Sequence, residues 1–209
     1  MTSPTGRPDL PACAGGAHVP TCTFSAPYPA PTPTPDPMPQ QRRFGQLDEQ
    51  LAERLNEHVS FEARSAFSYF AMASWAEVRG LTGFAQWFRG EAAGEIAHME
   101  QFVSHLNDRG FQATFGELPA PANEWESIAA VFESVVALEH DLSRRIEELI
   151  EVSHDRRDHF TGSFLQGFVP QQIADVAEAD EILDRLRLVG NEGRSIILID
   201  QELSAKASG

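Results

Sequence analysis

Residues 89–100 read Arg-Gly-Glu-Ala-Ala-Gly-Glu-Ile-Ala-His-Met-Glu, which places Glu95 and His98 three positions apart in a segment with helical periodicity. Residues at this spacing share one face of a helix, so a carboxylate oxygen and an imidazole nitrogen can bind one metal ion. The spacing alone is weak, because Glu151 and His154 repeat it in a polar stretch that we expect to be a solvated helix end. A metal site at Glu95 and His98 therefore requires partners from other helices.

The overall composition favours cations as partners. The chain has 209 residues, of which 42% are hydrophobic, and a formal net charge of -15. This length fits one domain with a tail, and the hydrophobic content suffices for a sizeable core. The negative charge excludes nucleic acid and anionic membrane surfaces as partners, since both are polyanions. No apolar run approaches the ~20 residues of a transmembrane helix.

The first 43 residues differ in composition from the rest of the chain. They hold most of the prolines and both cysteines, Cys13 and Cys22. A proline-rich segment favours extended polyproline and forms no packed core, so we predict a disordered arm at 1–43 and one domain at 44–209. Met38 offers an alternative start of translation. A domain without cysteine fits a reducing compartment, and we expect a cytoplasmic protein.

The periodicity of the remaining sequence predicts an all-α fold. Apolar residues recur with a helical period in four long segments, 47–79, 82–109, 127–153 and 159–188, and a short last helix is expected at 195–203. The 17 residues of 110–126 exceed what a helix hairpin needs. Extended, they span ~56 Å, against ~44 Å for a helix of ~29 residues. We predict a four-helix bundle of two hairpins joined by one long crossover, with a fifth C-terminal helix.

Polar residues interrupt each apolar stripe near the middle of its helix. They are Glu62, Glu95, His98, Glu139, Gln172 and Asp175. Carboxylates are almost never fully buried without a partner, and four at one level repel each other unless cations lie between them. A pair of divalent ions would offset this repulsion. The alternatives are a buried hydrogen-bond network without metal and a bundle that acts only as a scaffold.

Residues 51–204 resemble the non-haem bacterial ferritins. The spacings from Glu62 to Glu95, Glu95 to Glu139 and Glu139 to Gln172 are 33, 44 and 33 residues, as in the family's ferroxidase pattern. The resemblance also runs through four short segments: Leu55–Glu57, Glu95–Met99, Phe164–Gln166 and Ile199–Ser204. It implies a ferritin-like bundle that assembles into a hollow 24-subunit shell, with residues 195–203 at the four-fold axis.

The resemblance implies a ferroxidase with two iron ions in each subunit. Fe(II) would be oxidised by dioxygen or hydrogen peroxide, and the Fe(III) mineral would be stored in the shell. The first iron would bind Glu62, Glu95 and His98, with Glu95 as the bridge to the second. The second iron would bind Glu139, helped by Gln172 and Asp175. Tyr69 matches a tyrosine beside the family's centre, although a core tyrosine is an equal alternative.

The sequence departs from the family pattern at several positions. Asp175 stands where a longer carboxylate is usual, and a third iron site would lack its glutamates at Gly94, Gln171 and Ala174. Ile96 replaces the methionine that binds haem in bacterioferritins, so no haem is expected. Pro170 should kink the fourth helix one turn before Asp175. The alternative function is therefore a shell subunit with weak or no ferroxidase activity that acts as a structural or nucleation component.

Overall fold

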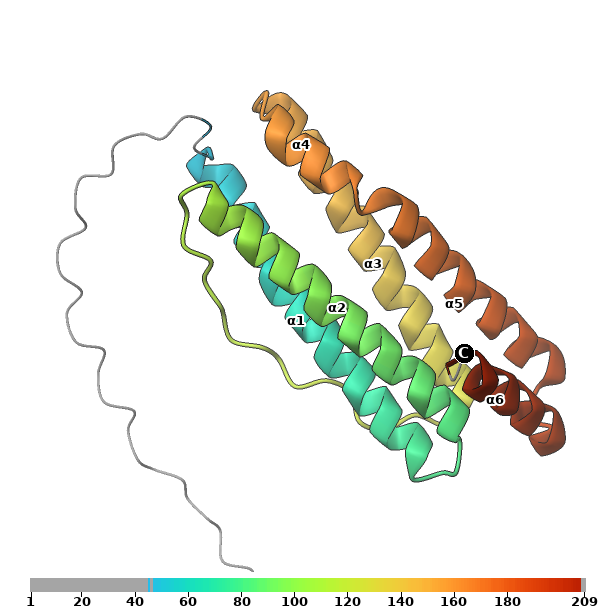
Figure 1. Cartoon of the computed structure of the whole chain (residues 1–209). Coiled ribbons are helices and arrows are strands. Elements are labelled where there is room, and N and C mark those ends of the chain that lie inside the picture. Colours follow the sequence, from blue (N-terminus) through green and yellow to red (C-terminus); the bar gives the residue numbers. More distant parts are fainter. Residues whose placement is uncertain (1–44, 46, 208–209) are drawn as a thin grey trace, which may run out of the picture. The chain divides into compact units, whose positions relative to one another are not determined.

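The computed structural model describes residue 45 and residues 47–207, and the regular structure within these ranges is entirely helical. The elements are α1 (Glu49–Glu77), α2 (Thr82–Asp108), α3 (Ile128–Asp155), α4 (His159–Gln166), α5 (Val169–Val189) and α6 (Gly193–Ala207). Figure 1 labels them along the chain. The predicted arm, with both cysteines and Met38, lies outside the described residues.

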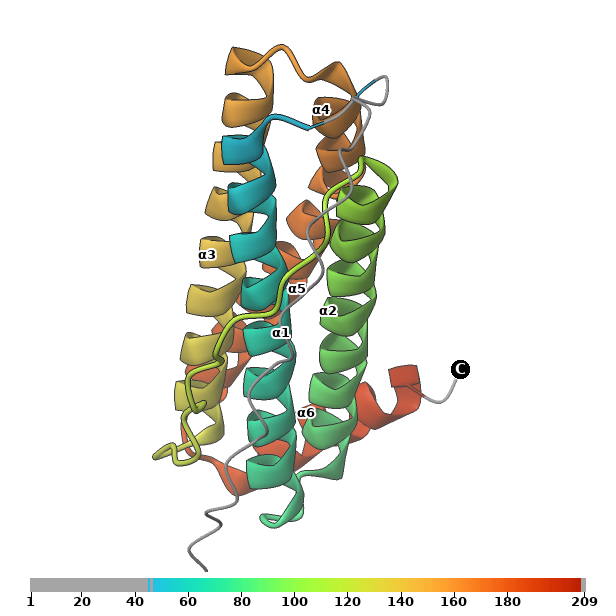
Figure 2. The same ribbon diagram turned by 90° about the vertical axis from the view of Figure 1, so that its left-hand side faces the viewer.

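The long helices form two hairpins. α1 packs along α2, and α3 packs against α4 and α5, while α1 also contacts α3. The segment 110–127 joins the two hairpins and runs along the length of the bundle (Figure 2). The predicted four-helix bundle with a long crossover is therefore confirmed. None of the helices in the described part is long and apolar enough to cross a membrane.

Local signals in the sequence set the ends of the helices. The side chains of Asp48, Ser127 and Asp158 each accept a hydrogen bond from the N–H three residues further on, at 3.3, 3.1 and 3.0 Å. Such bonds satisfy one of the free N–H groups in a first helical turn. Gly80 and Gly110 follow α1 and α2 with φ angles of 76° and 83°, which side chains disfavour.

The fourth helix is broken rather than kinked. α4 ends at Gln166, and the N–H groups of Gly167 and Phe168 bond to carbonyls three residues back, at 3.1 and 3.0 Å. Pro170 lies in the first two positions of α5, where its missing N–H costs no helical bond. The prediction of one continuous helix over 159–188 is therefore wrong, because glycine and proline together allow a new helix to start.

The core consists of two apolar clusters with a polar layer between them. One lies toward α6 and includes Phe84, Phe132 and Leu183. The other lies toward α4 and includes Leu55 and Phe102, and further buried members come from α3, from α4 and from Phe168 just before α5. In each of the four helical rods, the polar residues predicted at mid-height fall between members of the two clusters. The sequence pattern therefore places the polar layer at one level of the bundle.

The last helix lies across the end of the bundle and packs on α2 (Figure 1). It extends over Gly193–Ala207, longer than the predicted 195–203. The buried Asp200 carboxylate accepts a hydrogen bond from the N–H of Phe84 at 2.9 Å. A Cβ atom on Gly83 would lie 1.8 Å from the carbonyl oxygen of Asp200. A glycine at residue 83 thus permits the close approach of α6 to the start of α2.

Candidate metal centre

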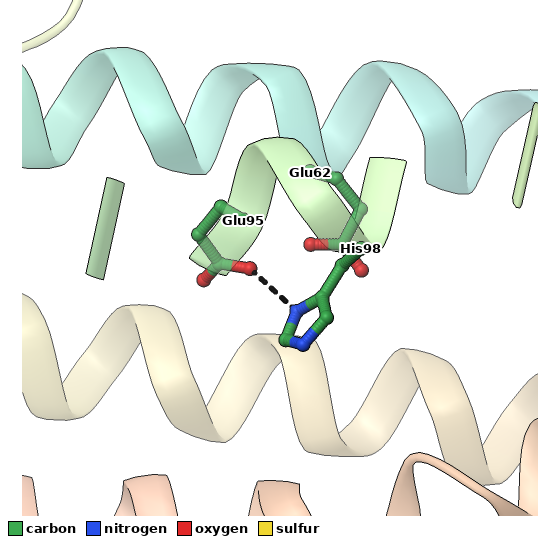
Figure 3. A group of neighbouring side chains, drawn as sticks. All are labelled: Glu62, Glu95 and His98. Carbon is green, nitrogen blue, oxygen red and sulfur yellow. Dashed lines mark hydrogen bonds and ion pairs between the residues drawn. The ribbon is translucent and has the colours of Figure 1, made fainter. Parts of the chain in front are cut away.

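Glu62 from α1 and Glu95 and His98 from α2 meet inside the bundle (Figure 3). One ligand atom from each of them lies within 4.8 Å of the other two. Nδ1 of His98 is 3.1 Å from Oε2 of Glu95. The exposed fractions are 2% for Glu62, 5% for Glu95 and 9% for His98. This Glu–Glu–His group combines the residues that the sequence predicted for the first ion.

The helical register explains why these side chains turn inward. Glu62 lies one turn after the buried Val59, and Glu95 and His98 lie between the buried Ala92 and Phe102. Residues three or four apart share a helix face, so the polar side chains continue the apolar stripes. The same packing that buries the core therefore forces the carboxylates out of water.

Glu139 from α3 is the centre of a second set of contacts. It is 3% exposed, and it accepts hydrogen bonds from the hydroxyl group of Tyr69 and from Nε2 of Gln172, the latter at 2.9 Å. Tyr69 is fully buried and belongs to α1, whereas Gln172 belongs to α5. The structure thus joins three of the predicted site residues from three helices.

Asp175 stands apart from these contacts. It is half-buried on α5 and is not a member of the Glu–Glu–His group. Burial raises the pKa of its carboxyl group, and the charge of Glu178 acts in the same direction. Glu139 is likewise outside the group of three. The roles of Glu139, Gln172 and Asp175 toward a second ion remain predictions.

Burial makes the carboxyl groups hold protons near neutral pH. It is the main cause that raises the pKa of Glu62 to about 7, of Glu95 to about 8 and of Glu139 to about 7. Nearby carboxylates strengthen the effect, since like charges oppose ionisation. A cation bound here would therefore have to displace protons.

His98 carries a proton in the same layer. Burial acts to lower its pKa, but the hydrogen bond that its ring N–H donates to Glu95 and the charges of Glu62 and Glu95 outweigh burial and raise the pKa to about 9. The resulting imidazolium is the positive charge nearest to the two carboxyl groups within the Glu–Glu–His group. A metal ion that binds His98 takes over this role and releases the proton.

An unsatisfied atom within the group supports its fit to a cation. Within the described residues, the buried Oε2 of Glu62 has no hydrogen-bond partner. Buried polar atoms are rarely left without partners, so such atoms point to an additional ligand. Two carboxylates and an imidazole form a donor set that suits iron and similar divalent ions.

The sequence analysis missed two residues of the polar layer, His58 and Glu91. Each lies four positions before a predicted ligand, Glu62 or Glu95, and so on the same helix face. Burial, followed by the charges of Asp175 and Glu139, raises the pKa of Glu91 to about 8. The spacing was the signal that could have identified both residues.

The second glutamate–histidine pair behaves as expected. Glu151 and His154 are both exposed in the last turns of α3, which confirms the prediction of a solvated helix end. Gln171 and Ala174, where the family's third site would have carboxylates, are also exposed.

Comparison with known proteins identifies the family. The ferritin-like domain family matches residues 52–189. A bacterial non-heme ferritin from Staphylococcus saprophyticus is 32% identical over 161 residues, which are 77% of this chain and 96% of the relative. A probable bacterial non-heme ferritin-like protein from Haemophilus influenzae is 31% identical over 157 residues, which are 75% and 95% of the two chains.

Solved structures agree with this result. The crystal structure of an open pore ferritin from the archaeon Archaeoglobus fulgidus has a TM-score of 0.75 and 34% identity, and the match covers 77% of this chain and 98% of that one. A closed form of the Archaeoglobus fulgidus ferritin, engineered by mutagenesis, gives a TM-score of 0.74 and 33% identity over 76% and 97% of the two chains. With its bundle, its crossover and its buried Glu–Glu–His group, the chain belongs to the ferritin family of iron-storage proteins.

Proposed function

We propose that this protein binds two Fe(II) ions in each subunit, oxidises them and stores the Fe(III) product as a mineral inside a hollow shell of its own copies. The observation that carries the proposal is the buried Glu–Glu–His group, whose ligand atoms lie within 4.8 Å of one another. A single ion with bonds of ~2.0–2.2 Å can bind atoms that are this close after small side-chain adjustments.

The first ion would bind Glu62, Glu95 and His98. Carboxylate ligands stabilise Fe(III) more than Fe(II), because the ferric ion is harder and more highly charged. A cage of carboxylates therefore favours loss of the electron. His98 contributes a neutral ligand after it releases its proton, and this proton and those of the carboxyl groups leave as the ions enter.

The second ion would bind Glu139, with Glu95 as the bridge and Gln172 and Asp175 as helpers. Glu139 is oriented by Tyr69 and Gln172, so its carboxylate is held in place before an ion arrives. Tyr69 is a hydrogen-bond donor to a ligand in this proposal. Two Fe(II) ions supply the two electrons that, with two protons, convert dioxygen to hydrogen peroxide or hydrogen peroxide to two waters.

Assembly into a shell is part of the proposal. The Archaeoglobus fulgidus relatives are described as open pore and closed forms, and we infer a homo-oligomeric shell around a cavity for this chain. Large apolar side chains support self-association, since Phe67 and Phe70 on α1 and Phe115 in the crossover are 56%, 46% and 65% exposed. Light scattering of the purified protein measures the assembly, with 24 copies expected from the resemblance.

A second candidate function is a shell subunit with weak oxidation. Two observations favour it: Glu139 and Asp175 lie outside the group of three, and the break between α4 and α5 lies about two turns before Asp175. Asp175 has a shorter side chain than glutamate and lies on α5, which begins after the break, so it would hold a second ion loosely. In that case the protein would store iron that is oxidised elsewhere.

Aerobic addition of Fe(II) separates the two functions. The proposal predicts a fast rise of ferric absorbance above the buffer rate, with two Fe(II) consumed per subunit in the first phase. The Glu95→Ala/His98→Ala variant should lose this phase and its bound iron while it keeps its fold. The matched control is Glu151→Ala/His154→Ala, which alters the exposed pair with the same spacing. Oxidation at the buffer rate by the wild-type protein would leave only the storage function.

A further inference from the structure

His58 is a buried histidine that the proposed function does not use. It lies on α1 one turn before Glu62 and is 2% exposed. Its ring packs against Phe102, with 4.4 Å between the centroids and 49° between the planes. Its Nε2 atom is 2.8 Å from Oε1 of Glu62. The ring is thus fixed by packing on one side and touches a predicted iron ligand on the other.

The contact between Nε2 of His58 and Oε1 of Glu62 is short, but its direction does not suit a hydrogen bond. The distance of 2.8 Å is that of a good hydrogen bond, whereas neither ring nitrogen of His58 has a partner in a suitable direction among the described residues. Oε2 of Glu62 also lacks a partner. A modest turn of the Glu62 carboxylate would align Oε1 with the ring, and an ion at Oε2 would favour that turn.

Distances exclude His58 as a ligand of the first ion in this arrangement. Donor atoms on opposite sides of one ion are at most ~4.4 Å apart, given bonds of ~2.0–2.2 Å. The set of residues with ligand atoms within 4.8 Å of one another contains Glu62, Glu95 and His98 but not His58. His58 can therefore act on the ion only through Glu62.

The space around the ring leaves no room for a second metal ion with its ligands. His58 lines a pocket of about 20 Å³ between α1 and α3, together with Arg145 and Glu148. This volume accommodates no more than about one water molecule. Arg145 also places a positive charge near the pocket, which opposes a cation there.

We propose that His58 is a positioning residue that holds Oε1 of Glu62 so that Oε2 faces the first ion. The inference rests on the proposed metal centre and goes beyond its ligand set. A group that bonds to the far oxygen of a ligating carboxylate fixes its orientation, and loss of such a partner typically lowers metal affinity ~10–100-fold. His58 should therefore raise the affinity of the first site without binding the ion.

Titration of metal-free protein with Co(II) at fixed pH tests this role, with calorimetry for affinity and visible absorption for coordination. His58→Leu removes the polar contact and should weaken the first Co(II) at least ~10-fold and alter its absorption. His58→Gln keeps an N–H donor and should stay within ~3-fold of the wild-type affinity. In a Glu62→Gln background, His58→Leu should cause no further loss, because the partner is already changed.

His105→Gln is the matched control. His105 is a partly buried histidine that also packs on an aromatic ring: it stacks on Phe164 with 4.2 Å between the centroids, and its Nε2 is hydrogen-bonded to Thr161 outside the metal centre. This variant should bind Co(II) as the wild type does. Circular dichroism checks the fold, and His58→Met replaces the leucine variant if the branched side chain does not fit.

Two results would overturn the positioning role. One is wild-type affinity and absorption in His58→Leu, and the other is an equal loss in the glutamine and leucine variants, which would attribute the effect to packing. Absence of Co(II) binding by the wild-type protein would instead overturn the proposed metal centre, and the inference with it. The wild-type titration thus distinguishes the two failures.

Discussion

Replacing Glu139 by glutamine should make the metal-free protein less sensitive to alkaline pH. The substitution keeps the size of the side chain and an oxygen for the Tyr69 hydroxyl, but it removes a group that ionises in a buried site. Burial, together with the charge of Glu95, raises the pKa of Glu139 from 4.5 to about 7. The folded state therefore binds this proton more tightly than the unfolded chain does.

The sign and size of the effect follow from this difference. For a raised pKa, the stabilising contribution is fully present below about pH 4.5 and is lost as the pH rises through about 7. Each pKa unit corresponds to ~1.4 kcal/mol. The wild-type free energy of unfolding should therefore fall by ~3 kcal/mol more than that of Glu139→Gln between about pH 4.5 and about pH 8.

Guanidinium unfolding of chelator-treated protein, followed by circular dichroism at several pH values, measures the difference. Glu151→Gln on the exposed face of the same helix is the control and should follow the wild type. Divalent ions should abolish the alkaline loss in the wild type, since they replace the protons. Parallel pH curves for wild type and Glu139→Gln would refute the argument that the buried charge is costly.

Three further outcomes are expected. Affinity of the Glu–Glu–His group for Co(II) should rise from about pH 6 to about pH 8, with proton release in a pH-stat, because its carboxyl pKa values are raised; a flat profile would contradict bound protons. Asp158→Asn should cost ~3 kcal/mol in denaturant unfolding near neutral pH, because Asp158 pairs with the mostly buried Arg109 at 2.7 Å. Burial acts to raise the pKa of Asp158, but Arg109 outweighs burial and lowers the pKa. The stability lost in Asp158→Asn should therefore vanish only as the pH falls below 3.8. An unchanged loss of stability below this pH would exclude the ion pair as its source. Gly83→Ala should loosen α6 and expose 193–207 to proteases, whereas Gly90→Ala, whose Cβ meets nothing within 4 Å, should not; equal cleavage of both would show that the contact with Asp200 does not hold α6.

The periodicity of the sequence determined the rods, the crossover and the level of the polar layer. Leu55, Val59 and Glu62 share a helix face because of the 3.6-residue repeat, whatever the neighbouring helices do. The long spacings between Glu62, Glu95 and Glu139 then place these acids at mid-height. These features depend on residues that are close in sequence and on helix length, so they can be predicted from the sequence alone.

Only the tertiary structure decided which polar atoms meet. The rotation of each rod and the distance between rods bring Glu62 to Glu95 and His98 but leave Glu139 with Tyr69 and Gln172. The sequence at Gly167 and Pro170 is compatible with either a kinked helix or two separate helices, and only the tertiary structure shows that α4 ends and α5 begins there. The environment of His58 was decided in the same way: its four-residue spacing from Glu62 can be read from the sequence, but its packing against Phe102 of α2 depends on the neighbouring helix, which no repeat along one chain encodes.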